Sequence, residues 1–237
     1  MITLYGMGSP NVVKVYIALE ELGLPYTVAP VDVFTGKQFD AEFLKLNPNA
    51  KVPVIVDTDG PNGKPYTCFE SGAILLYLAD KTGKLLPAGK SEKFDAIQWL
   101  MIQMSTVGPM FGQFVHFLRF APAGNDYAKS RYFTQAYRVC EVIEQRLGAA
   151  AYLAGAEYSV ADIATYPWFR NIPTLLGAET MTRLPNIARW IKQIDERPAV
   201  QKALAEVDAV RARTTPFDKA EAVALDKMFG RGQFAAA

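Results

Sequence analysis

The spacing of hydrophobic positions changes near residue 83 of this 237-residue chain. Before that point, short apolar runs with strand character alternate with helical stretches, which is typical of an α/β arrangement. The expected strands are 2–5, 26–28, 52–56 and 66–69, and the expected helices are 11–22, 41–46 and one that begins at residue 71. Turn-forming residues fill the segment before the last strand, so we expect the last two strands to be antiparallel neighbours.

Long helical periodicity replaces this alternation in the second part of the chain. Apolar residues recur at steps of three and four, which is the pattern of helices that share a core. Gly108 and Pro109 interrupt the first of these helices and predict a bend, because proline cannot donate to the helical ladder. Ser159 and Asp162 have the spacing of a capping box that starts a later helix.

These patterns predict a division of the chain into four parts. We expect a first domain at residues 1–82, a linker at 83–92, an all-helical domain at 93–213 and an extension at 214–237. The extension follows no pattern that predicts an element.

Composition narrows the classes of function. The 25 basic and 24 acidic residues leave a net charge of +1 with no basic cluster, so no nucleic-acid partner is expected. The N-terminus is typical of a strand rather than a signal peptide, and no apolar stretch reaches the ~18 residues of a membrane helix. We expect a cytoplasmic protein that does not enter a membrane.

Cysteine and histidine, the residue types of disulfides and of most zinc sites, are rare in the chain. The two cysteines, Cys68 and Cys140, lie far apart and outside any Cys-x-x-Cys motif, and His116 is the single histidine. We therefore expect no disulfide framework and no metal site.

Two segments suit a ligand that carries a free amino-acid end. Pro53 follows Val52 at the start of an apolar strand, and a cis bond there would leave the Val52 backbone able to pair with an extended ligand. Glu70 and Ser71 open a helix whose unpaired N–H groups suit a carboxylate, while the Glu70 side chain suits an ammonium group. The alternatives are a loop-ending proline and ordinary helix capping.

A third segment, Ser9-Pro10-Asn11, begins the first helix. Ser9 is suited to the N-cap and Pro10 to the first helical position, and the donors of Ser9 and Asn11 are candidates to point toward a bound sulfur. Simple capping is the alternative.

These segments resemble the glutathione transferase family, and among its classes the chain is most similar to the bacterial nu class. The likeness is carried by Ser9-Pro10-Asn11, Asn49 to Pro53, Glu70 to Ile74, Gly36 to Phe39, Gly108-Pro109-Met110 and Arg131-Tyr132. It implies a thioredoxin-like βαβαββα domain followed by a C-terminal helical-bundle domain, assembled as a homodimer. The likeness fades beyond Arg213.

The resemblance implies an enzyme that reduces disulfide bonds with the thiols of bound glutathione, and that has weaker transferase or peroxidase activity. Ser9 stands where relatives with their own nucleophile carry cysteine, so Ser9 and Asn11 would stabilise the glutathione thiolate. Expected glutathione-binding residues are Gln38, Lys51, Val52, Pro53, Glu70, Ser71, Arg131 and Tyr132. Expected partners are glutathione, oxidised glutathione, and a small disulfide or electrophile. Conventional conjugation of electrophiles and a non-catalytic glutathione-binding module remain open alternatives.

Overall fold

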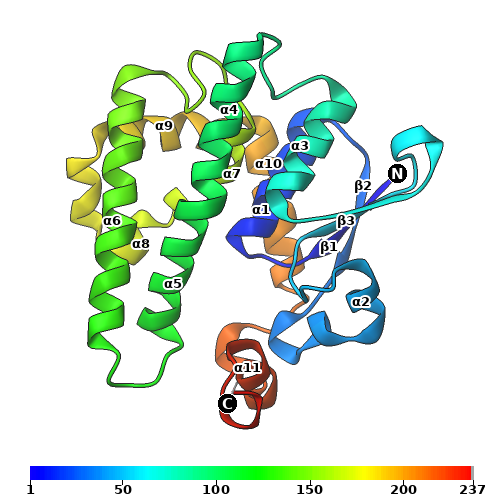
Figure 1. Cartoon of the computed structure of the whole chain (residues 1–237), viewed down its shortest axis with the longest axis vertical. Helices are drawn as coiled ribbons and strands as arrows, with labels where there is room; N and C mark the ends of the chain where they lie inside the picture. The colour runs from blue at the N-terminus through cyan, green and yellow to red at the C-terminus, as the bar shows by residue number, and fades with distance from the viewer. Residues whose placement is uncertain (236–237) are drawn as a thin grey trace. The chain divides into compact units, whose positions relative to one another are not determined.

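The computed structural model describes residues 1–235. Internal contacts divide it into two compact units. One unit contains residues 1–74 together with the chain from 201 onward, and the other contains residues 75–200 (Figure 1).

A four-stranded mixed sheet forms the centre of the first unit, with the strand order β2-β1-β3-β4. The strands are β1 (Ile2–Gly6), β2 (Tyr26–Pro30), β3 (Val54–Asp57) and β4 (Tyr66–Phe69). β1 pairs parallel with β2 and antiparallel with β3, and β3 pairs antiparallel with β4, as predicted for the last two strands. β3 begins two residues later than expected, since Pro53 has no N–H for the ladder.

Three helices of this region connect or follow the strands in the order that the sequence predicts. α1 (Pro10–Leu22) joins β1 to β2, α2 (Ala41–Leu46) precedes β3, and α3 (Ser71–Thr82) follows β4. Two short 3₁₀ turns, η1 (Val33–Thr35) and η2 (Lys37–Phe39), lie between β2 and α2. The predicted thioredoxin-like βαβαββα order is confirmed.

Helix α1 lies in the core of the first unit. Every residue from 12 to 19 is buried, so this helix is enclosed on all sides. α10 (Pro198–Arg211) lies along it (Figure 1), and Lys202 Nζ contacts Glu20 Oε2 at 2.8 Å.

The second unit is helical, which confirms the prediction for this part of the chain. Its helices are α4 (Lys90–Ile102), α5 (Gly108–Arg119), α6 (Asp126–Ala149), α7 (Val160–Phe169), α8 (Ile172–Leu176) and α9 (Pro185–Asp195), with a 3₁₀ segment η5 (Ala178–Arg183). α5 and α6 run side by side (Figure 1), and every residue of α7 is buried.

At the predicted interruption near Gly108-Pro109, the backbone hydrogen-bonding pattern changes from α-helical to π-helical and back. A π-helical segment, η4 (Gln103–Val107), joins α4 to α5, and Pro109 lies at the start of α5. Proline removes an N–H from the α-helical ladder, and the wider π turn accommodates the missing bond.

The capping box of α7 is confirmed. Asp162 is fully buried, and its carboxylate accepts hydrogen bonds from the N–H groups of Leu153 (2.9 Å) and Ser159 (3.0 Å), the Ser159 hydroxyl (3.1 Å) and Trp190 Nε1 (2.9 Å). A buried carboxylate with four donors around it is satisfied, so Asp162 stabilises the start of α7 and its packing against α9.

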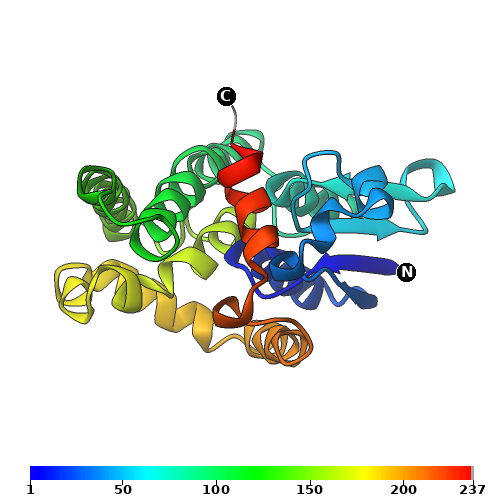
Figure 2. The same cartoon turned by 90° about the horizontal axis from the view of Figure 1, so that it is seen from below.

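The C-terminal extension, for which the sequence predicted no element, contains a helix. A 3₁₀ turn, η6 (Phe217–Lys219), leads into α11 (Ala222–Phe229) and a further turn, η7 (Gly232–Phe234). Figure 2 follows this segment, in orange to red, from the end of α10. The N–H of Glu221 donates to the Phe34 carbonyl at 3.0 Å, so the extension contacts the loop between β2 and α2.

Residues 1–235 contain no helix that is both long and apolar enough to cross a bilayer. Within the same residues, no group of three or more His, Cys, Asp or Glu side chains is arranged to hold a metal ion.

Candidate functional site

The sheet register brings the predicted ligand-binding segments to the same end of the sheet. Tyr5 of β1 lies opposite Val54 of β3, and Val54 lies opposite Phe69 of β4. The chain that leaves β1 toward Ser9, the chain that enters β3 through Val52, and the chain that leaves β4 toward Glu70 therefore share one end of the sheet. β2 runs parallel to β1, so the loop that carries η1 and η2 leaves from the same end.

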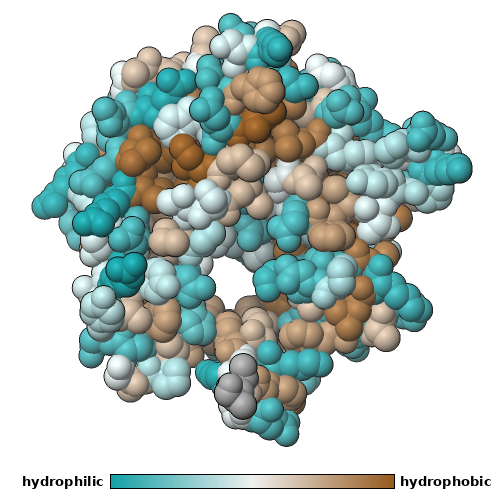
Figure 3. All heavy atoms as spheres, in the orientation of Figure 1, coloured by the Kyte–Doolittle hydropathy of each residue, from teal (hydrophilic) through white to brown (hydrophobic). Residues whose placement is uncertain are grey.

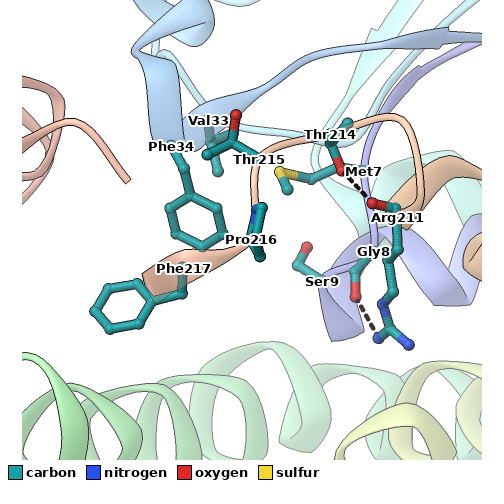
Figure 4. A pocket seen from close by; sticks show the side chains of 10 residues that line it. All are labelled: Met7, Gly8, Ser9, Val33, Phe34, Arg211, Thr214, Thr215, Pro216 and Phe217. Carbon is teal, nitrogen blue, oxygen red and sulfur yellow. Dashed lines mark hydrogen bonds between the residues drawn. The ribbon is translucent and has the colours of Figure 1, made fainter. Parts of the chain in front are cut away.

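Ser9 occupies the N-cap of α1, but its side chain makes no capping hydrogen bond. Instead, Ser9 lines a pocket of about 320 Å³, into which its hydroxyl points (Figure 4). The N-terminus of a helix carries positive potential from the helix dipole. A hydroxyl donor and a helix N-terminus at one place suit an anion such as a thiolate. Asn11, the second residue of α1, is partly buried.

The C-terminal segment forms much of this pocket's wall. Besides Ser9, the pocket is lined by Met7, Gly8, Val33, Phe34, Arg211, Thr214, Thr215, Pro216 and Phe217. The rings of Phe34 and Phe217 meet edge to face with centroids 5.7 Å apart, and most of the wall is apolar. Arg211 donates to the Gly8 carbonyl at 2.9 Å, so the end of α10 is held against the start of α1.

The Val52–Pro53 peptide bond is cis. Among the described residues, the backbone hydrogen bonds made outside helices and strands include none from the N–H or C=O of Val52. The preceding carbonyl, of Lys51, accepts from the buried side chain of Asn47 at 2.7 Å, which fixes the loop that leads to Val52. An extended ligand would find the polar backbone groups of Val52 available for pairing.

Glu70 and Ser71 form the start of α3. Glu70 is exposed and has a φ of 67°, in the left-handed region that favours glycine, and its carbonyl accepts from the N–H of Ile74 at 2.9 Å. Ser71 is almost fully buried. Backbone strain of this kind costs of order 1–3 kcal/mol and is concentrated at functional sites, which fits a ligand role for this turn.

Lys14, on α1, is the functional candidate that the sequence analysis missed. Its side chain is fully buried, and Nζ donates to Ser71 Oγ at 3.1 Å. Burial lowers the pKa of this lysine to about 7, and the negative charge of Glu70 opposes that change. The signal in the sequence was a single lysine inside the apolar run from Val12 to Ile17.

The residues proposed for the far end of the ligand differ in burial. Lys51 is exposed, whereas Gln38 on η2 is 2% exposed and its Oε1 has no hydrogen-bond partner in residues 1–235. Their assignment to a ligand carboxylate stays a prediction.

Arg131 and Tyr132 belong to the other unit, on α6. Arg131 is exposed, and the Tyr132 ring stacks on Phe117 with centroids 5.4 Å apart and an interplanar angle of 6°. Their assignment to a second ligand also stays a prediction.

Both cysteines are buried and free of disulfide bonds. Burial raises the pKa of Cys68 to about 11 and that of Cys140 to about 12. Because the thiolate is the reactive form of cysteine, neither side chain is poised as a nucleophile at neutral pH.

Two models of protein-family domains match the chain, one in its first part and one in its second part. The model of the "Glutathione S-transferase, N-terminal domain" matches residues 8–81, and that of the "Glutathione S-transferase, C-terminal domain" matches residues 94–198. The chain belongs to the glutathione S-transferase family.

Similar proteins agree with this family. The disulfide-bond oxidoreductase YfcG of Escherichia coli is 41% identical over 210 residues, which cover 86% of this chain and 94% of the relative. A glutathione transferase of Burkholderia graminis, solved with two glutathione molecules per subunit, is 46% identical with a TM-score of 0.80, and the match covers 86% of this chain and 87% of that one. A glutathione transferase of Pseudomonas putida, solved with one glutathione disulfide per subunit, is 39% identical with a TM-score of 0.81, over 86% and 90% of the two chains. The predictions of the family, of the fold class and of an enzyme of this family are confirmed.

Proposed function

We propose that this protein is a glutathione-dependent disulfide-bond reductase of the nu class, in which the thiols of two glutathione molecules carry out the reaction. One glutathione thiolate attacks a sulfur of the substrate disulfide, forming a glutathione mixed disulfide and releasing one substrate thiol after protonation. The second glutathione thiolate attacks the glutathione sulfur of that mixed disulfide. Oxidised glutathione and the second substrate thiol are the products, so two electrons pass from the two glutathiones to the substrate.

The main support for this proposal is that both cysteine side chains are buried and have raised pKa values. The chain has two cysteines, and both are buried with raised pKa values. Ser9, which lines the pocket, supplies a hydroxyl at the helix N-terminus rather than a sulfur. A disulfide reductase without a usable protein thiol needs its thiols from the ligand.

Ser9 and the N-terminus of α1 favour the glutathione thiolate. A free thiol has a pKa near 8.5, so it is mostly protonated at neutral pH. A charge-assisted hydrogen bond from Ser9, together with the helix dipole, is sufficient to lower that pKa by about one unit, which corresponds to ~1.4 kcal/mol. Asn11 is the second donor proposed for the sulfur.

The remaining site residues bind the backbone and ends of the tripeptide. The backbone of Val52, set by the bond to Pro53, pairs with the cysteinyl residue of glutathione. The start of α3 at Ser71 binds the glutamyl α-carboxylate, and Glu70 binds the neighbouring ammonium group.

The other assignments concern the glycyl end and the second glutathione. Gln38 and Lys51 hold the glycyl carboxylate by amide donation and by charge. Arg131 and Tyr132 bind the second glutathione.

Conjugation of electrophiles is the second candidate activity, and the composition of the pocket beside Ser9 favours it. The ring contact between Phe34 and Phe217, and the apolar side chains of Met7 and Val33, suit an apolar electrophile. The same thiolate would then form a thioether instead of a disulfide.

Steady-state assays separate the two activities. The purified protein is given glutathione and a small dialkyl disulfide, and in parallel glutathione and a chlorinated aromatic. The proposal expects disulfide reduction well above the uncatalysed exchange and slower conjugation. Brisk conjugation without catalysed reduction would favour the second candidate, and glutathione binding without either activity would favour a binding module.

We infer a cytoplasmic homodimer. Exposed apolar side chains support the dimer, since large exposed apolar patches mark association surfaces. On the face seen in Figure 3 they gather over α4 and toward α6, and the exposed large apolar residues of these helices include Phe94, Met101 and Val142. Light scattering on the purified protein tests the dimer.

A further inference from the structure

We propose that Lys14 is a positioning residue for the ligand's α-carboxylate, acting through the Ser71 hydroxyl at the start of α3. This inference rests on the proposed function, because it concerns how the glutamyl end of glutathione is recognised. Lys14 comes from α1 and Ser71 from α3, and both belong to the first unit.

The burial of Lys14 is the first observation. A buried ammonium group is costly unless it is paired and hydrogen-bonded, and a lysine is almost never fully buried unless it is paired. The neighbouring residues Val13, Val15 and Ile17 of α1 are apolar and buried, so an apolar side chain would suit this position. A cation retained at this position therefore points to a task other than filling space.

The hydrogen bond to Ser71 indicates which group Lys14 acts on. An ammonium group has donors only, so the Ser71 oxygen accepts from Lys14 Nζ at 3.1 Å. The hydroxyl hydrogen of Ser71 then points away from Lys14. Lys14 thereby orients and polarises the hydroxyl as a donor at the N-terminus of α3, where the helix dipole favours negative charge.

The local charges match the glutamyl end of the ligand. In its protonated form, Lys14 together with the α3 dipole places positive potential behind Ser71, and Glu70 places an exposed negative charge beside it. A carboxylate next to an ammonium group meets both. The carboxylate also supplies a second negative charge near the buried lysine, so ligand binding and the protonated state of Lys14 favour each other.

The test uses three ligands and calorimetry on the full chain. The ligands are glutathione, 4-aminobutyryl-cysteinylglycine, which lacks only the α-carboxylate, and glutaryl-cysteinylglycine, which lacks only the α-ammonium group. Lys14→Met removes the charge and the donor while keeping the length of the lysine's aliphatic stem. Lys202→Met, at an exposed lysine of the same unit, is the matched control.

Lys14→Met is expected to weaken binding of glutathione and of the glutaryl analogue by about 10- to 100-fold, and to leave binding of the 4-aminobutyryl analogue within about twofold. Lys202→Met leaves all three unchanged. Ser71→Ala is expected to change the three affinities in the same way as Lys14→Met. If Lys14→Met does not fold, the affinities of Ser71→Ala test the inference.

Two results would overturn the inference alone: wild-type protein that binds glutathione while both variants bind it equally well, or variants that weaken all three ligands to the same extent. If the wild-type protein binds no glutathione, the proposed function fails first and this inference falls with it.

Discussion

Asp32 and Thr215, 183 positions apart in sequence, are joined by a hydrogen bond of 2.8 Å from the Thr215 N–H to Asp32 Oδ2. The other carboxylate oxygen of Asp32 accepts from the Phe34 N–H at 3.2 Å. One side chain thus fixes both the η1 turn and the C-terminal segment, the two elements that form the apolar wall of the pocket beside Ser9.

Replacing Asp32 by alanine should loosen that wall. Loss of two charge-assisted hydrogen bonds predicts a fall of about 1–3 kcal/mol in the free energy of unfolding, measured by urea titration. KM for the disulfide should rise, while glutathione affinity stays within about twofold. The exposed Asp218 of the same segment is the control, and Asp218→Ala should change stability by less than ~0.5 kcal/mol. An unchanged KM in Asp32→Ala would separate the C-terminal segment from substrate binding.

Ser9→Ala should affect chemistry more than folding. The Ser9 hydroxyl makes no capping bond, so the variant should lose less than ~0.5 kcal/mol of stability, whereas a working cap would contribute about 0.5–2 kcal/mol. The pKa of the bound glutathione thiol should rise by about one unit, with a kcat about tenfold lower at neutral pH. Ultraviolet thiolate absorbance against pH measures the first quantity, and Ser9→Thr, which keeps the hydroxyl, should stay close to wild type. A large loss of stability with an unchanged thiol pKa would return Ser9 to simple capping.

Glu70→Gly should separate stability from binding. The φ of 67° at Glu70 is strained for any side chain but natural for glycine, so the variant should be as stable as wild type or more stable by up to ~1 kcal/mol. The ligand's ammonium group would lose its partner, so glutathione should bind about 10- to 100-fold more weakly. Calorimetry and thermal unfolding measure the two effects, and unimpaired binding by Glu70→Gly would remove Glu70 from the site.

Lys14 should give the stability of the protein a definite dependence on pH. Its pKa is about 7 in the folded protein against 10.5 when exposed, so between these values the unfolded chain binds more protons and unfolding becomes less favourable as pH rises. Below pH 7 both states are protonated, and the full penalty of burying the charge remains. Lys14→Met should therefore be more stable than wild type by a few kcal/mol near pH 6, and this advantage should shrink toward pH 10.

Paired urea titrations of wild type and Lys14→Met at several pH values measure that difference. Lys202→Met shows what loss of an exposed lysine does over the same range. A difference between wild type and Lys14→Met that does not vary with pH would mean that Lys14 keeps its ordinary pKa.

Much of the fold was predictable because it follows from local patterns. Alternating apolar runs predicted the four strands, turn formers predicted the antiparallel pairing of β3 with β4, and the spacing of Ser159 and Asp162 predicted the start of α7. In each case the signal lies within a few consecutive residues.

The features that escaped prediction depend on contacts between distant segments. The pairing of Lys14 with Ser71 spans 57 positions, and the docking of the C-terminal segment by Asp32 spans 183. The turn from β4 into α3 imposes the left-handed backbone conformation of Glu70. Glutamate is not a residue type that predicts this conformation. Sequence patterns could locate the segments that form the proposed ligand site, but not the side chains from distant positions that hold these segments in place.

The central claim is that the reactive sulfur belongs to bound glutathione. The most direct measurement is disulfide reduction by the double variant Cys68→Ala, Cys140→Ala, in folded protein with glutathione as the only thiol. We predict turnover within about twofold of wild type, and no glutathione attached to wild-type protein trapped during turnover and weighed by mass spectrometry. Loss of turnover in the folded variant, or a protein–glutathione mixed disulfide in the wild type, would contradict the account.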